Sequence, residues 1–446
     1  MSVDSQVRDA HAAWLQIREW DSAKIVALLG SIADALDQAK ADLVPVAMEE
    51  TNLPEARLTG EVGRTTGQLR LMARAVEDRT YLDITIDHAD SSLTPPRPDL
   101  RLKSTSLGVV GVFGASNFPF AFGVAGGDTA AALAAGCAVV IKVNPGHPRV
   151  SRMVGEIMIA AALKAGAPAG LISLVEDFDA GMALVEHPLT AAIAFTGSTE
   201  VGKKIARAIA ATDKKATLEL GGKGANIVFD DAPVDEAVEG VVNGIFFNQG
   251  HVCCAGSRLI LQESIAEEII EKLKVRMAKI RVGDPLDKNT DLGAINSREQ
   301  LTKIQELAAI GDAEGAQRWS PQCNLSDKGY WFAPTIFTGV TQAHRIAQEE
   351  IFGPVLSVIT FRTPQEGIDK ANNTPFGLSA GIWSEKGSRT LWASQQLRAG
   401  VIWANTFNKF DPTSPFGGYK ESGWGREGGK HGLAAYLKTG RESGGK

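Results

Sequence analysis

The sequence predicts an α/β protein with two doubly wound parallel-sheet lobes and a small β arm. Three observations support this fold class. Apolar runs of strand length alternate with helical segments over residues 108–211, and a second alternation runs from about Ala225 to Phe416. Residues 81–104 match neither pattern. Continuous apolar strands separated by helices are typical of parallel sheets that helices cover on both faces.

The segment 108–141 opens the first alternation and contains a single charged residue, Asp128. We expect a strand over Gly108–Gly114, a turn at residues 116–119, a helix of small residues and a strand over Ala138–Lys142. A membrane span would need roughly 20 continuous apolar residues without such breaks. The pattern therefore favours a buried βαβ unit.

The later elements continue the alternation, and two lobes joined near Leu220 are the simplest division. The expected helices are Arg149–Ala165, Val201–Ala211, Val234–Asn248 and Ile265–Ile280, and the expected strands are Leu171–Val175, Ala191–Phe195, Asn226–Phe229 and Ser257–Gln262. We place one domain over residues 1–80 and 105–219, the arm over 81–104, a second domain over 220–418, and a return segment with the tail over 419–446.

The arm consists of two half-apolar stretches. Leu82, Ile84 and Ile86 alternate with polar residues, and a second alternation starts at Leu100 after a proline-rich link. Strands of this kind outside a parallel sheet suggest an arm that buries its apolar face on another subunit. A flap folded onto its own domain is an equally good interpretation.

The composition excludes several function classes. Lys and Arg total 46 and Asp and Glu total 52, and this net charge of −6 argues against a nucleic-acid-binding surface. We expect no membrane segment, and a cytoplasmic location, because the chain starts without a basic and apolar leader and its 4 cysteines form no CxxC pair. The 7 histidines show no metal-ligand spacing, so no metal site is expected.

Two glycine-containing segments match phosphate-binding motifs only in part. In residues 197–204, Lys204 stands where a P-loop needs a Ser or Thr for Mg²⁺. The GxGxxG fingerprint of dinucleotide-binding folds is also missing after Gly222. A strand that ends at Phe195–Ser198 and opens a helix still offers free backbone N–H groups to a pyrophosphate.

The strongest constellation is residues 248–258, which place Cys253 and Cys254 in a glycine-flanked loop between a helix and a strand. A cysteine at an arbitrary position is most often a small buried hydrophobe. Glu219 lies between apolar residues at the lobe junction, where a lone glutamate usually forms a structural ion pair. Together, however, these residues supply a nucleophile and a base.

Six short motifs follow one another along the chain: Ser116–Pro119, Phe195–Ser198, Leu218–Lys223, Gly250–Arg258, Glu349–Pro354 and Ser414–Gly423. With these motifs in this order, the sequence resembles the NAD(P)-dependent aldehyde dehydrogenase superfamily across nearly the whole chain. The 34 residues from position 219 to position 253 also resemble the family's spacing of base and nucleophile. Up to about residue 200 the chain looks most like α-ketoglutaric semialdehyde dehydrogenases and beyond it like general aldehyde dehydrogenases, as in a natural or engineered mosaic.

The resemblance implies a set of catalytic residues. Cys253 matches the nucleophile, and Asn117 matches the residue whose side-chain amide stabilises the oxyanion. Glu219 matches the base that activates the hydrolytic water, and Glu427 a second acid for proton relay. The implied reaction oxidises a small aldehyde to a carboxylic acid through a thiohemiacetal and a thioester on Cys253, with hydride transfer to NAD(P)⁺.

The resemblance also implies binding residues and an assembly. The implied cofactor residues are Lys142 at the adenosine ribose, Gly197 and Ser198 at the pyrophosphate, and Glu350 and Phe352 at the nicotinamide ribose. Phe118, Phe410 and Phe416 match an aromatic substrate tunnel, although ordinary core packing explains them nearly as well. The family implies a homo-oligomer, either a dimer or a tetramer. A thiol esterase, or a silent relative that acts as a binding module, are the alternative functions.

Several positions depart from the family pattern. His251 replaces a common Gln, and no Lys near residues 126–128 partners Glu427. The tail, residues 438–446, lacks the apolar alternation of the usual oligomerisation strand. Pro145 stands where NAD⁺-selective relatives carry a Glu, so NADP⁺ is favoured over NAD⁺. We expect Lys142, together with His147 or Arg149, to pair with the 2′-phosphate. In the alternative, Pro145 only shapes the loop and both cofactors are usable.

Overall fold

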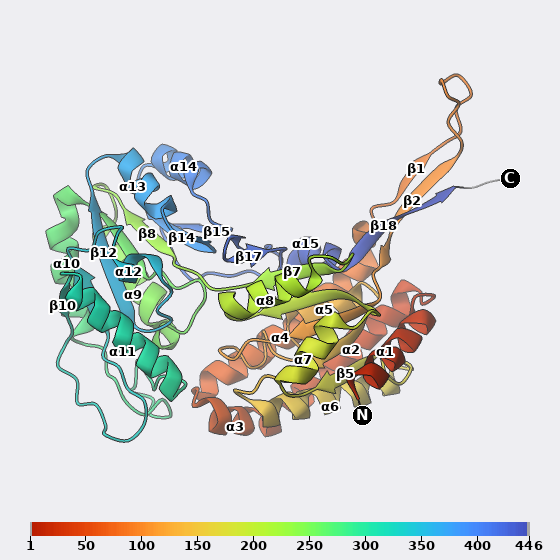
Figure 1. Ribbon diagram of the computed structural model, residues 1–446, viewed down its shortest axis with the longest axis horizontal. Helices are drawn as coiled ribbons and strands as arrows, with labels where there is room; N and C mark the ends of the chain where they lie inside the picture. Colours follow the sequence, from red (N-terminus) through yellow and green to blue (C-terminus); the bar gives the residue numbers. More distant parts are fainter. Residues whose placement is uncertain (1, 444–446) are drawn as a thin grey trace.

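The structure is a computed structural model that describes residues 2–443 and has the predicted α/β fold. Two large, mostly parallel sheets form separate lobes, and a three-stranded arm projects from one of them (Figure 1). The expected strands and helices of both alternations are present. The structure adds a helix and a strand between residues 178 and 219 that the sequence analysis did not assign.

The first lobe contains a six-stranded sheet of order β17-β7-β6-β3-β4-β5. Its strands are β3 (Val109–Phe113), β4 (Ala138–Lys142), β5 (Ile172–Val175), β6 (Thr190–Thr196), β7 (Lys215–Glu219) and β17 (Gly423–Trp424). All neighbouring strands are parallel except β17, which pairs antiparallel with β7. The carboxyl ends of β3, β4, β6 and β7 therefore meet at one edge of the sheet, where ligands bind in folds of this type.

Helices surround this sheet; some bury their apolar faces against its strands, and others, such as α2, bury them against neighbouring helices. They are α1 (Val3–Ile17), α2 (Ser22–Gln38), α3 (Lys40–Thr51), α4 (Glu55–Asp78), α5 (Gly127–Ala134), α6 (Pro148–Lys164), α7 (Phe178–Glu186), α8 (Thr199–Ile209) and α15 (Gly429–Ala434). In α2 the buried residues Ile25, Leu28, Leu29 and Ile32 recur at helical spacing. Every residue of α5 is buried, which its small side chains permit.

The second lobe contains a seven-stranded sheet of order β10-β11-β12-β9-β8-β14-β15, parallel except for the β10–β11 pair. The strands are β8 (Ala225–Val228), β9 (Arg258–Gln262), β10 (Gln317–Trp319), β11 (Thr335–Thr338), β12 (Val355–Phe361), β14 (Ser379–Trp383) and β15 (Val401–Ala404). The helices are α9 (Val234–Phe246), η2 (Phe247–Gly250), α10 (Glu263–Met277), α11 (Arg298–Ala313), α12 (Arg345–Gln348), α13 (Pro364–Asn372) and α14 (Gly387–Gln396). A short pair, β13 (Phe376–Gly377) and β16 (Tyr419–Lys420), lies beside it.

The chain returns from the second lobe to the first near its end. Gly423 in β17 has φ +110°, and a Cβ there would lie 1.8 Å from the carbonyl oxygen of Leu218. Only glycine allows this close approach of two backbones. The return places the segment around Glu427 beside the end of β7.

The arm consists of β1 (Thr85–Asp87), β2 (Leu100–Ser106) and β18 (Leu437–Ser443), in the order β1-β2-β18. The predicted first strand is shorter than expected, because Leu82 ends the 3₁₀ turn η1 (Thr80–Leu82) and Asp83 is left-handed. Ile84 and Ile86 are 60% and 53% exposed, so the arm is not a flap folded onto its own domain. Figure 1 shows it extending away from the body.

The absence of apolar alternation in the tail did not prevent a strand. Leu437–Ser443 pair antiparallel with β2 along their whole length. Strand pairing uses backbone N–H and C=O groups, and the open edge of β2 supplies them whatever side chains the tail carries. Among the helices of residues 2–443, none combines the length and apolar character that crossing a bilayer requires.

Candidate active site

Two cavities meet at Cys253, which lines both. The first cavity, of about 540 Å³, follows the carboxyl edge of the first sheet. The second, of about 890 Å³, is lined by a different set of residues apart from Cys253. The predicted residues divide between them. Those lining the first are Asn117, Lys142, Pro145, Gly197, Ser198, Glu219, Glu350 and Phe352, and those lining the second are Phe118, Phe410, Phe416 and Glu427.

Cys253 lies in the loop between η2 and β9. The chain enters this loop through Asn248 and Gln249, both left-handed at φ 52° and 56°, and through Gly250 at φ 72°. A hydrogen bond with Cys254, followed by burial, raises the pKa of the Cys253 thiol well above its ordinary value. The nucleophile therefore needs a base to become a thiolate at neutral pH.

Cys254 has a different environment from its neighbour. It is 2% exposed, and its thiol donates to Asn408 Oδ1 at 3.7 Å. Its side chain lines only the second cavity, whereas Cys253 lines both.

Glu219 ends β7 and is only 3% exposed. Neither carboxyl oxygen has a hydrogen-bond partner among the described residues. Burial raises the pKa of Glu219 well above its usual range, and the nearby Glu427 and Cys253 raise it further. Among the described residues Glu219 therefore has no ion-pair partner within bonding distance, and its raised pKa makes the ionised carboxylate a stronger base than an exposed one.

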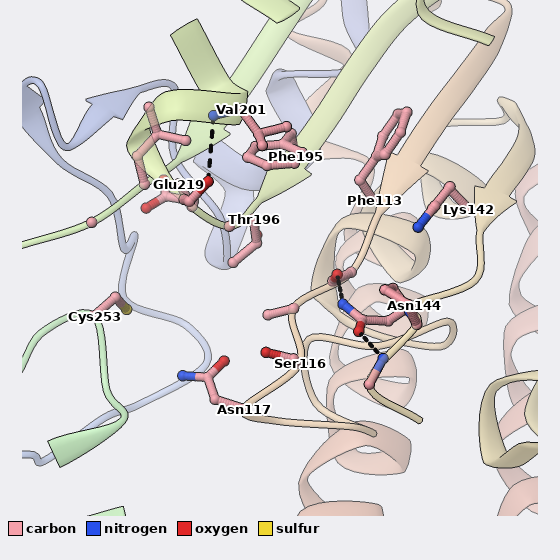
Figure 2. Close-up of a pocket in the computed structure, with 18 of the residues that line it drawn as sticks. Phe113, Ser116, Asn117, Lys142, Asn144, Phe195, Thr196, Val201, Glu219 and Cys253 are labelled. Carbon is pink, nitrogen blue, oxygen red and sulfur yellow. Dashed lines mark hydrogen bonds between the residues drawn. The ribbon is translucent and has the colours of Figure 1, made fainter. Parts of the chain in front are cut away.

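Asn117 follows β3 and faces the thiol. Its side-chain amide donates to the carbonyl oxygen of His251 at 2.9 Å, and its own carbonyl oxygen accepts from Arg57 at 2.7 Å. Figure 2 shows the amide nitrogen on the side where Cys253 lies. Because an amide nitrogen carries two N–H groups, one remains for a ligand in the cavity.

Glu427 belongs to a buried cluster of acids. Burial, and then Asp128, raise the pKa of Glu427 to about 8, while Arg64 and Gln68 oppose this shift. The hydroxyl of Tyr436 donates to Asp128 at 2.6 Å, and burial raises the pKa of Asp128 to about 6. Where the family pattern has a lysine near residues 126–128, this protein therefore presents a further acid. Glu427 keeps its proton at neutral pH as a result.

Lys142 is the last residue of β4 (Figure 2), Ser198 follows the end of β6 by two residues, and both line the first cavity. Burial lowers the pKa of Lys142, and Asp177 opposes this shift. Ser198 caps α8 by accepting from the N–H of Val201 at 3.3 Å. Ser198 is thus the N-cap residue of a helix whose N-terminus borders the cavity.

Glu350 and Phe352 close the end of the cavity near the thiol. Glu350 Oε1 accepts from the N–H of Gly222 at 2.8 Å. Phe352 is left-handed at φ 54°, and its ring stacks on His251 at 5.5 Å between centroids. Burial, and then Arg57, lower the pKa of His251 to about 4, so this ring is neutral.

The three predicted tunnel phenylalanines line the second cavity, and Phe118 and Phe416 also pack against the core of the second lobe. Phe118 and Phe416 are half-buried, and Phe410 is 44% exposed. Phe410 and Phe416 meet edge to face at 5.6 Å. These rings form an apolar wall near the thiol.

Two cations expected near the adenosine end lie elsewhere. His147 is fully buried, and its ring nitrogens bond Ser151 Oγ and the carbonyl oxygen of Ala115. Arg149 instead forms an ion pair with Glu49 at 2.8 Å. Neither residue lines the first cavity, and the partners just named account for where their side chains lie.

Sequence reasoning missed several residues of the site. Gln300 in α11 donates to the carbonyl oxygens of Ile351 and Phe352 and so fixes the loop that carries Phe352. Phe178 lines the first cavity and is 59% exposed, which an aromatic at the start of a helix does not reveal from sequence. Arg57, in α4, lies about 60 residues before the first of the motifs in the sequence.

Among residues 2–443, no group of three or more His, Cys, Asp and Glu side chains is arranged to hold a metal ion.

Comparisons with known proteins identify the family of this chain. The family model described as "Aldehyde dehydrogenase family" matches residues 1–440. An aldehyde dehydrogenase of Enchytraeus buchholzi is 38% identical over 445 residues, covering 98% of this chain and 86% of the relative. The chain belongs to the aldehyde dehydrogenase family, and the predicted class of enzyme is confirmed.

Solved structures give the same result. Betaine aldehyde dehydrogenase from Staphylococcus aureus, in complex with NAD⁺, superposes with a TM-score of 0.91 at 30% identity, covering 99% of this chain and 86% of that one. An NAD-dependent aldehyde dehydrogenase from Sinorhizobium meliloti gives a TM-score of 0.88 at 34% identity, with 99% and 87% covered. The predicted two-lobed fold is confirmed.

The pKa of Glu427 predicts a pH dependence of stability. Its carboxyl titrates near 4.5 in the unfolded chain and near 8 when folded, so between these values only the folded protein holds the proton. The contribution of this carboxyl to the free energy of unfolding is full below the pKa of the unfolded chain and is lost as the pH rises towards 8. Glu427→Gln is neutral throughout, so from pH 5 to 8 it should lose less stability than the wild type, by on the order of 1 kcal/mol per pH unit.

Urea unfolding at pH 5, 6, 7 and 8 measures this difference. Glu306→Gln, at an exposed position in α11, is the control and should follow the wild type. Parallel stability curves for the wild type and Glu427→Gln would contradict the expectation.

Proposed function

We propose that this protein oxidises a small aldehyde to a carboxylic acid with Cys253 as the nucleophile. The observation that carries the proposal is that the Cys253 thiol stands where the two cavities meet. An aldehyde entering through the second cavity and a nicotinamide in the first would reach this atom from opposite sides. Asn117 and Glu219 line the first cavity beside it.

The first step is attack of the Cys253 sulfur on the aldehyde carbon. A C–S bond forms, and negative charge develops on the aldehyde oxygen. The free N–H of the Asn117 amide and the backbone N–H of Cys253 are the donors proposed for this oxyanion. The thiol proton leaves to a base, since its raised pKa keeps it bound in the resting enzyme.

The second half of the reaction hydrolyses the thioester on Cys253. The proposed base is Glu219, whose carboxyl is buried beside the thiol and accepts no hydrogen bond from the described residues. In its ionised form Glu219 takes a proton from water as the water oxygen attacks the acyl carbon. The C–S bond then breaks, the acid product leaves and the thiol is regenerated. Glu427, whose charge acts on Glu219, is proposed to pass the proton onward.

The first cavity fits a nicotinamide dinucleotide. The N-terminus of α8 borders this cavity, and the first N–H groups of a helix can bind a pyrophosphate. The N–H of Gly197 is not among them, because it donates to the carbonyl oxygen of Glu219 at 3.0 Å. A Cβ at position 197 would lie 2.6 Å from the Phe195 ring. Glu350 and Phe352 lie near the thiol and Lys142 lies at the other end. When bound, NAD(P)⁺ supplies the acceptor for the hydride that leaves the substrate carbon.

We further propose that NADP⁺ is accepted and preferred. Pro145 and Lys142 both line the first cavity, so this region carries a cation and no acid at position 145. Of the three cations expected near the 2′-phosphate, Lys142 is the one that lines the first cavity, because His147 and Arg149 are held by other partners.

The arm and the cell compartment are further parts of the proposal. Ile84, Ile86 and Leu93 are exposed on the arm at 60%, 53% and 45%, which supports burial against another copy of this chain in a dimer or tetramer. The division into a cofactor domain (residues 1–80 and 105–219), an arm, a catalytic domain (220–418) and a return segment is consistent with the two sheets. A reducing, cytoplasmic environment suits the four free cysteines.

The first prediction that follows from the proposed function separates the two adjacent cysteines. Cys253→Ala should abolish the aldehyde-dependent formation of reduced nicotinamide, because alanine cannot form the thioester. Cys254→Ala should retain most of the activity, since Cys254 does not line the first cavity. Absorbance at the reduced-nicotinamide band measures both, with circular dichroism to establish folding. Equal loss in two folded variants would refute the assignment.

The second prediction concerns Glu219→Gln. If Glu219 serves hydrolysis, the first turnover should still yield a burst of reduced nicotinamide, whereas steady turnover should fall by ~10²–10⁴-fold, as for the loss of a general base. Stopped-flow absorbance resolves the two phases. Loss of the burst together with steady turnover would instead assign Glu219 to activation of the thiol.

The third prediction concerns cofactor choice. The wild type should show a higher kcat/KM with NADP⁺ than with NAD⁺, and Pro145→Glu should move the ratio towards NAD⁺ by about tenfold or more, because a carboxylate repels the 2′-phosphate and accepts from ribose hydroxyls. Pro145→Gln controls for loss of the ring. A wild-type preference for NAD⁺ beyond about tenfold would overturn the proposed preference.

A further inference from the structure

Arg57 in α4 joins two loops that carry the proposed catalytic residues. Its guanidinium donates to the carbonyl oxygen of Asn117 at 2.7 Å and to Oδ1 of Asn248. Asn117 lies after β3, and Asn248 lies five positions before Cys253. One side chain thus contacts both segments that line the thiol.

These contacts close into a ring of four hydrogen bonds. The side-chain amides of Asn117 and Asn248 both donate to the carbonyl oxygen of His251, at 2.9 and 3.0 Å. Arg57 completes the ring by bonding Asn117 and Asn248. Each residue in the ring therefore makes two of its hydrogen bonds. Arg57 holds the backbone of Asn117, and the Asn117 side chain reaches from there to His251.

The loop before Cys253 needs such support. Asn248 and Gln249 are left-handed residues other than glycine, a conformation that costs free energy unless the surroundings impose it. The Arg57 guanidinium also lies over the rings of Phe118 and Phe247, with centroids 4.9 and 5.5 Å away. These contacts hold the cation between the two loops.

Glu61, one turn along α4, extends the same support. Its Oε1 accepts from the N–H groups of Phe120 and Ala121 at 2.8 and 3.0 Å, so it fixes the continuation of the Asn117 loop. Burial lowers the pKa of Arg57, and the charge of Glu61 opposes this shift. Through Arg57 and Glu61, helix α4 therefore holds the backbone of the loop that contains residues 117–121.

We propose that Arg57 is a positioning residue that aims the Asn117 amide at the oxyanion formed on Cys253. The proposal rests on the proposed function, because it takes Asn117 as the oxyanion donor. The two terminal NH₂ groups of one planar guanidinium donate to the oxygens of Asn117 and Asn248. A lysine ammonium carries the same charge but cannot place two donors at this fixed spacing. Arg57→Lys therefore separates geometry from charge.

The test is acylation of the enzyme by p-nitrophenyl acetate, followed as the burst of p-nitrophenolate. This step uses the thiol and the oxyanion donors and needs no nicotinamide. Arg57→Lys should slow it roughly 10- to 100-fold, less than the ~10²–10³-fold loss expected for Asn117→Ala, which removes the donor outright. In the Asn117→Ala background, Arg57→Lys should cost less than about threefold, since the positioned group is gone.

Alkylation of Cys253 by iodoacetamide provides the second readout. Displacement at a saturated carbon forms no oxyanion, so its rate in Arg57→Lys should stay within about twofold of the wild type. Arg70→Lys, on the same helix but paired with Asp34 and Asp37 at the surface, is the matched control and should match the wild type in both assays. If Arg57→Lys does not fold, Asn248→Gly breaks the same ring while keeping the left-handed backbone.

Unchanged acylation in Arg57→Lys, equal slowing of acylation and alkylation, or additive losses with Asn117→Ala would each overturn the proposal. Failure of the proposed function is distinguishable from these outcomes. A wild-type enzyme that is acylated but forms no reduced nicotinamide from any aldehyde would refute the dehydrogenase function and leave the role of Arg57 intact.

Discussion

The site depends on close packing between the end of β7 and the loop that carries Cys253. A Cβ at Gly222 would lie 2.2 Å from the carbonyl oxygen of Cys253, so the two backbones are in direct contact. Glu350 reinforces the junction by accepting from the N–H of Gly222. This contact brings Glu219 from the first lobe beside a thiol from the second, and it sets the boundary at which the two cavities meet.

Burial at this junction controls the protonation of the groups. Glu219, Glu427 and Asp128 are removed from water with no buried cation bonded to any of them in the described residues, and burial is the first cause that raises each pKa. The thiol of Cys253 is likewise protonated. A desolvated acid releases its proton reluctantly and takes one up readily, which suits a site that must move protons between a thiol, water and product.

Supports outside the reacting groups determine their orientation. Helix α4 fixes the Asn117 loop through Arg57 and Glu61, and Gln300 fixes the carbonyls of Ile351 and Phe352. The C-terminal return adds a third support, since β17 pairs with β7 next to Glu219. These contacts come from helices and strands far apart in the chain, and together they leave little freedom to the loops they hold.

The sequence by itself determined the fold class, most element positions and the motif residues around Cys253, because strand and helix periodicities and short glycine-bounded motifs are local. Only the tertiary structure decided what long-range packing controls. His147 and Arg149 turn away from the cavity, the tail forms a strand on β2, and Arg57 joins two loops, because each outcome depends on partners about 30 to more than 300 residues away. A local pattern specifies which groups are present, whereas burial and distant partners specify their protonation and direction.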